Sequence, residues 1–204
     1  MWEQLLSFSF FTALLALSPG PDNIFVLTQS LVNGAKKGIA TTAGLISGCI
    51  VHTTFLAFGV SALIAASPTA IWVIKIIGAV YLFYLAWKVF GSDASITLSK
   101  DVDPKSYGQL YRTGVIMNLV NPKVLLFFLA FFPSFLWLPE QQTVVQFYIL
   151  GLVFMLVSFM VFSSIALLAG SISSYLMKHK HTGLYLKWLQ ILVFIGIALF
   201  ILFT

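Results

Sequence analysis

A cluster of proline and glycine residues interrupts the first hydrophobic segment of this chain. Ser18-Pro19-Gly20-Pro21-Asp22 follows a mostly apolar stretch from Leu5 to Leu17, and helical character resumes at Ile24. Proline has no backbone N–H, so it breaks the hydrogen-bond ladder of a helix. Each unsatisfied backbone group costs several kcal/mol in hydrocarbon, so such a break is tolerated only where it is buried in protein or lines a cavity.

The composition predicts that this break does lie in a lipid bilayer. Of the 204 residues, 60% are hydrophobic and only 8% are charged, whereas a soluble domain carries roughly 25% charged residues. So few charges cannot cover a water-facing surface, which indicates an integral membrane protein. We assign the net charge of +5 to cytoplasmic loops and not to nucleic-acid binding. The sequence contains no set of residues with metal-ligand spacing, and we expect no metal or cofactor.

The chain divides into six hydrophobic segments long enough to cross a bilayer, which needs about 20 helical residues per span. They predict an all-α membrane protein with one transmembrane domain over residues 1–204. We expect a first repeat at about 1–90, a polar linker at 91–110 and a second repeat at about 111–204. The predicted spans are 4–32, 39–66, 70–90, 111–137, 143–170 and 184–203.

Basic residues predict the orientation of these spans. Nine of the eleven Lys and Arg residues lie in or beside the connections between spans one and two, three and four, and five and six. The positive-inside rule puts these three connections in the cytoplasm and both termini outside the cell. If the first span were a re-entrant loop, the N-terminus would instead lie inside.

A second break, Asn121-Pro122-Lys123, interrupts the fourth span. Because each half has an odd number of spans, the second half runs upside down in the membrane relative to the first. This predicts two inverted three-helix repeats. Broken helices at corresponding places in two halves indicate the binding site of a transporter. The predicted substrate-site residues are Pro19, Gly20, Pro21, Asp22, Asn118, Asn121, Pro122 and Lys123.

The ionisable residues at the two breaks have both structural and functional interpretations. A charge inside a membrane is costly and indicates function. Asp22 can cap the resumed helix, or it can meet a substrate ammonium or a coupling proton. Lys123 can stabilise its own break or bind a ligand. We expect the two to flank a midplane cavity and to bind a zwitterion. Asn118 either faces this cavity or hydrogen-bonds another helix.

Small residues recur every four positions in the second span. Gly44 and Gly48 form a GxxxG pattern, which is typical of close helix packing. The same spacing puts His52 on or beside this face, directed into the bundle. His52 is then either a hydrogen-bonded core residue or a proton-coupling group.

The two break motifs resemble the signature motifs of the LysE/RhtB amino-acid exporters, and the likeness extends to Gly44–Gly48 and Gly78–Leu82. The resemblance, closest to the homoserine/threonine branch, implies a carrier of the bacterial inner membrane, so the termini that the basic residues place outside the cell would be periplasmic. It implies export of an amino acid such as threonine, homoserine, leucine or a basic one, driven by proton entry. The implied partners are therefore the amino acid, protons and the lipid bilayer.

One departure from the family affects the expected mechanism. Many members carry an acid in the fifth span, roughly where this chain has Met155. Its absence puts a two-carboxylate proton relay in doubt, gives more weight to Asp22 and His52, and favours a neutral substrate. The alternatives are an exporter of basic amino acids or cations, an intramembrane enzyme acting on lipid-linked substrates, or a structural subunit. No nucleophile–base motif supports the enzyme, and the sequence leaves homo-oligomer formation open.

Overall fold

The computed structural model describes residues 1–93, 105–139, 141–179 and 181–203. Every regular element within these ranges is helical, which confirms the predicted all-α class. The central part of the predicted linker, 94–104, lies outside the described residues, as do Glu140 and Lys180. Thus the described chain contains both predicted breaks and all the predicted site residues.

Among the described residues, four helical segments are long and apolar enough to cross a membrane. The first is α3, which continues through a π-helical turn at Leu56–Val60 into α4. The other three are α5, α8 and α10. Their bounds are Ala35–Phe55 for α3, Ser61–Ala66 for α4, Pro68–Phe90 for α5, Thr143–Leu167 for α8 and Thr182–Phe203 for α10. A short helix, α9 (Ala169–Lys178), lies between α8 and α10.

Two further helix pairs are bent at the predicted breaks. Helix α1 (Trp2–Leu17) meets α2 (Pro21–Asn33) at 62°. Helix α6 (Tyr107–Val120) meets α7 (Pro122–Phe131) and its 3-10 extension Phe132–Phe135 at 57°. The part of the chain that the structure describes then holds up to six candidate spans, if each bent pair counts as one.

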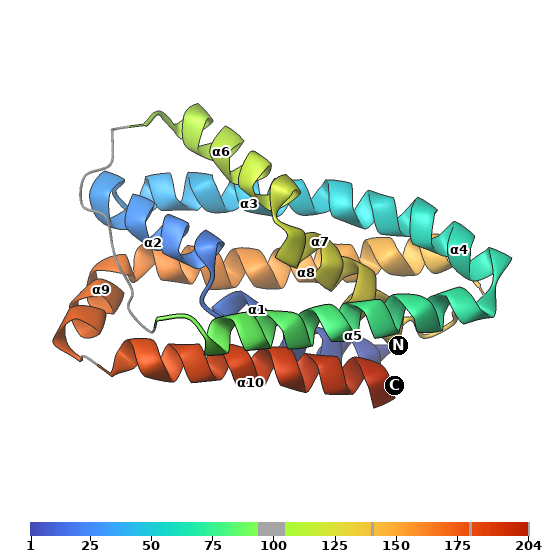
Figure 1. Cartoon of the computed structure of the whole chain (residues 1–204). Coiled ribbons are helices and arrows are strands. Elements are labelled where there is room, and N and C mark those ends of the chain that lie inside the picture. Colours follow the sequence, from blue (N-terminus) through green and yellow to red (C-terminus); the bar gives the residue numbers. More distant parts are fainter. Residues whose placement is uncertain (94–104, 140, 180, 204) are drawn as a thin grey trace.

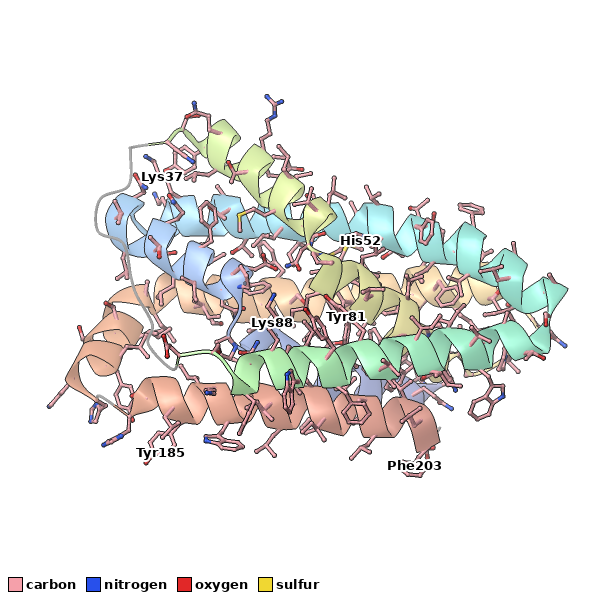
Figure 2. All side chains as sticks on the ribbon, viewed as in Figure 1. Lys37, His52, Tyr81, Lys88, Tyr185 and Phe203 are labelled. Atoms are coloured by element: carbon pink, nitrogen blue, oxygen red, sulfur yellow. The ribbon has the colours of Figure 1, made fainter. Side chains whose placement is uncertain are left out.

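The connections sort to the two ends of the bundle. Both termini and the α4–α5 connection lie toward one end in Figure 1, whereas the α2–α3 and α9–α10 connections and the start of α6 lie toward the other. Figure 2 shows Lys37 and Tyr185 toward this second end, Phe203 toward the first, and His52 between them. The basic connections that the structure describes therefore share one end.

Phenylalanine rings fix α7 in the core. Two rows of stacked rings run along α7 into its 3-10 extension, with centroids 4.5 Å apart for Phe127 and Phe131 and 4.2 Å for Phe128 and Phe132. Phe8 of α1 lies 5.3 Å from Phe131 and 5.0 Å from Phe132. Such pairs each contribute about 0.5–1.5 kcal/mol beyond area burial, so they hold α1 and α7 in a defined relation.

Glycines bring α6 against α3. A Cβ on Gly44 would collide with the backbone of Tyr111, and a Cβ on Gly114 would collide with the backbone of Thr41 and Leu45. Gly48 lies against the side chain of Asn118 in the same way. The predicted small-residue face of α3 is thus in contact with α6, and it sets the position of Asn118 and of the break that follows.

Candidate functional site

The first break leaves the start of α2 without a side-chain cap. The N–H of Ser18 closes α1 by donating to the carbonyls of Leu14 and Leu15, at 3.0 and 3.1 Å. Helix α2 then begins at Pro21, and its N-cap residue is Gly20, which has no side chain to offer. Of the two interpretations of Asp22, the structure does not support the cap, because Asp22 lies within the first turn of α2 and makes no capping hydrogen bond. The N-terminus of α2 therefore keeps its partial positive charge.

The second break caps itself. Asn121 is the N-cap residue of α7, and its Oδ1 accepts a hydrogen bond from the N–H of Lys123 at 3.0 Å. Pro122 occupies the first helical position, where its missing N–H costs nothing. The N–H of Asn121 donates to the carbonyl of Asn118 at 3.2 Å and closes α6. The local hydrogen bonds of this break follow the Asn-Pro pattern in the sequence.

The two breaks meet although they are far apart in the sequence. Nδ2 of Asn121 donates to Oδ2 of Asp22 at 3.1 Å. Nζ of Lys123 lies 3.3 Å from the position that a Cβ on Gly20 would occupy, so the glycine permits this approach. The charges of Lys123 and Asp22 attract each other. Within the described part of the chain, Oδ1 of Asp22 is buried without a hydrogen-bond partner.

A cavity of about 50 Å³ lies where these groups converge. Its polar groups come from the two breaks, from Asn118 before the second break and from Ser158 of α8, and its apolar wall comes from α1, α3, α7 and α8. The polar lining residues include Asp22, Asn23, Asn118, Asn121, Lys123 and Ser158. The apolar lining residues include Leu15, Ile46, Val124, Phe127, Phe154 and Phe162. One carboxyl and one amine beside an apolar wall can hold a small zwitterion that has a neutral side chain.

Two broken helices that form one charged cavity are typical of a transporter, and comparison with known proteins identifies which kind. Residues 13–204 match the family described as LysE type translocator. The chain belongs to this family. The match confirms the resemblance seen in the sequence, and it makes the protein a transporter and not an enzyme.

Named relatives agree with this assignment to the LysE type translocators. The chain is 31% identical over 175 residues to the homoserine/homoserine lactone efflux protein of Salmonella typhimurium (strain LT2), which covers 86% of this chain and 84% of that protein. The protein of the same name from Salmonella typhi shows the same identity and coverage. No solved structure matches the chain.

Six of the residues predicted for the substrate site of this LysE type translocator line the cavity. They are Gly20, Pro21, Asp22, Asn118, Asn121 and Lys123. Pro19 and Pro122 shape the breaks from outside the lining, and Pro122 is exposed.

His52 lies outside the cavity lining. Its ring packs on Phe128 at 5.5 Å, and its Nε2 lies 3.3 Å from the carbonyl oxygen of Asn118. This carbonyl also accepts the N–H of Asn121. His52 is therefore linked to the cavity indirectly, through Asn118 at the end of α6.

Sequence reasoning missed two polar residues of the cavity. Nδ2 of Asn23 donates to the carbonyl of Ala16 at 2.6 Å, so a side chain of α2 satisfies the end of α1. Its place two residues after Pro21 is a signal that could have suggested this role. Ser158 of α8 is the other missed residue. Met155, the position where related carriers are expected to have an acid, packs instead against the hydrophobic core.

The described residues hold no cluster of three or more His, Cys, Asp or Glu side chains that could bind a metal ion. The polar groups of the cavity are a carboxylate, an amine, amides, a hydroxyl and the thiol of Cys49, whose sulfur accepts a hydrogen bond from Nδ2 of Asn118. This donor set suits hydrogen bonding to an organic ligand better than coordination of a transition metal.

Proposed function

We propose that this protein is a secondary transporter that exports a neutral amino acid or a close derivative, of the threonine, homoserine and leucine class, across the bacterial inner membrane. Membership of the LysE type translocator family supports export, and the names of the Salmonella relatives support homoserine or its lactone as the first compounds to test. We further propose six spans in two inverted repeats that alternate access to the cavity.

The observation that carries this proposal is the meeting of the two breaks. Asn121 of the second break bonds Asp22 of the first, and Lys123 lies beside Gly20. A zwitterion that enters between Asp22 and Lys123 presents its ammonium to the carboxylate and its carboxylate to the amine. The uncapped N-terminus of α2 adds a second attraction for the substrate carboxylate. Both ends of an amino acid are thereby recognised.

The same carboxylate accounts for proton antiport. Asp22 binds either a proton or the substrate ammonium, because protonation removes the negative charge that holds the ammonium. A proton that arrives from outside releases the substrate there, and its loss to the cytoplasm lets the next substrate bind. His52 remains the second proposed proton-coupling group, acting indirectly through Asn118.

We also propose that the end of the bundle with the basic connections faces the cytoplasm. The connections that carry Lys36, Lys37 and Lys178 share this end, and the positive-inside rule assigns such loops to the cytoplasm. Both termini would then be periplasmic.

The test is transport by the purified protein in liposomes with a pH gradient. We expect homoserine movement that a protonophore abolishes. Asp22→Asn should lower this flux by about 100-fold, because losing the carboxylate that pairs with the substrate ammonium costs about 3 kcal/mol of binding. Glu3→Gln, an acid-to-amide change at an exposed position of α1, is the matched control and should transport normally.

A His52→Gln variant separates the two proposed proton groups. It should keep gradient-driven flux and change only its pH profile. Wild-type flux in Asp22→Asn, or homoserine flux that does not depend on the pH gradient, would contradict the antiport mechanism.

A further inference from the structure

The face of α8 that lines the cavity is aromatic except at one position. Phe154, Ser158 and Phe162 are spaced four residues apart, so they lie on one side of the helix, and all three line the cavity. Ser158 is only 2% exposed. A single buried hydroxyl therefore stands between two phenylalanines.

The hydroxyl of Ser158 lacks the local hydrogen bond that many helical serines make. A serine in a helix commonly donates back to the carbonyl four residues earlier. Ser164, also on α8, does so to Met160 at 2.8 Å, and Ser47 of α3 does so to Ala43 at 2.8 Å. Oγ of Ser158 is buried and has no partner among the described residues. Since buried polar groups are normally hydrogen-bonded, this hydroxyl is available to a ligand in the cavity.

The charged groups of the cavity determine which part of a substrate reaches Ser158. Asp22 and Lys123 come from α2 and α7, and they recognise the ammonium and carboxylate that all amino acids share. The remaining wall, with Phe127 of α7 and the α8 face, is left for the side chain.

We propose that Ser158 is a specificity-determining residue that hydrogen-bonds an oxygen in the side chain of the transported amino acid. The inference rests on the proposed function and deepens it: short neutral amino acids with a side-chain hydroxyl are preferred to apolar molecules of the same shape. The phenylalanines on either side of Ser158 exclude water, so the hydrogen bond discriminates more strongly than it would in a hydrated site.

The test compares pairs of substrates that differ by one group. Export of homoserine is measured against norvaline, in which a methyl replaces the hydroxyl, and threonine against valine. The wild-type protein in liposomes should prefer the hydroxyl compound of each pair. Ser158→Ala should reduce this preference by about tenfold, the loss expected for one buried hydrogen bond. Ser158→Thr, which retains a hydroxyl, should preserve part of the preference.

Ser163→Ala is the matched control. Ser163 lies on the same helix and its Oγ is also buried without a partner in the described chain, but it is not part of the cavity lining. This variant should keep the wild-type preference. An unchanged preference in Ser158→Ala, or a wild-type protein that transports norvaline as well as homoserine, overturns the role of Ser158. Absence of amino-acid flux in the wild-type protein would instead refute the proposed function.

Discussion

The two breaks bend their helix pairs by similar angles, 62° and 57°, but they satisfy their backbone groups in different ways. At the second break, Asn121 caps α7 with its own side chain. At the first, Asn23 satisfies a carbonyl of α1, and the N-terminus of α2 begins at Gly20 without a side-chain cap. The N-terminus of α7 is therefore occupied by its own cap, whereas the N-terminus of α2 has no side-chain cap and is the helix end that we propose for the substrate carboxylate.

The difference gives the two breaks complementary roles. The second break supplies side chains, since the amide of Asn121 donates to Asp22 and the amine of Lys123 lies beside Gly20. The first supplies a carboxylate and an uncapped helix end. Because each break contributes groups that the other lacks, the cavity needs both halves of the chain.

Among the substitutions that test this comparison of the two breaks, the largest loss of export should come from making the first break resemble the second. Gly20→Ser adds an oxygen that can cap α2 and a Cβ that displaces the amine of Lys123. We expect export to fall by about tenfold or more, equivalent to about 1.4 kcal/mol. Stability should change by only about a few tenths of a kcal/mol, because serine and glycine are both acceptable N-cap residues. Flux in liposomes and thermal unfolding measure the two effects.

Gly108→Ser is the control for this substitution. A Cβ on Gly108, in the exposed first turn of α6, would meet nothing within 4 Å. It should transport normally. If Gly20→Ser also exports at the wild-type rate, the open end of α2 plays no part in binding.

A smaller loss of export is expected at Asn121, where two substitutions separate its bond to Asp22 from its cap of α7. Asn121→Ser keeps an N-cap oxygen but loses the amide that reaches Asp22, and Asn121→Ala loses both. Both variants should export about fivefold more slowly, since one hydrogen bond contributes about 1 kcal/mol. Only Asn121→Ala should also lose about 1 kcal/mol of stability through its missing cap. Full export by Asn121→Ser would show that the bond between the breaks is dispensable.

The smallest effect should come from the proline of the second break. Pro122 is exposed and outside the cavity lining, and Asn121 caps α7 without it. Pro122→Ala should therefore change export by less than about twofold, because proline at the first helical position mainly preorganises the helix. Pro21→Ala, at a residue that lines the cavity, provides the comparison and should be the more damaging change. Equal losses in both variants would argue against the asymmetry of the two breaks.

The sequence by itself determined the class of the protein, its family and the location of both breaks. Composition requires a membrane, and proline ends a helix wherever it removes the N–H that the helix needs. The cap of α7 was also predictable from the sequence, because Asn121 bonds the backbone N–H of Lys123, two residues further along the chain. Helix ends are set by local backbone chemistry, and local chemistry is written in the sequence.

Only the tertiary structure decided which side chains face the cavity. Asp22 bonds Asn121 and does not cap α2, and His52 lies behind Asn118. Ser158 faces the cavity, whereas Met155 packs against the core. All of these placements depend on how the helices are rotated and bent. These rotations come from packing between distant segments, the phenylalanine rows of α7 against Phe8 and the glycines of α3 against α6. A single sequence records the residues of such contacts but not their pairing.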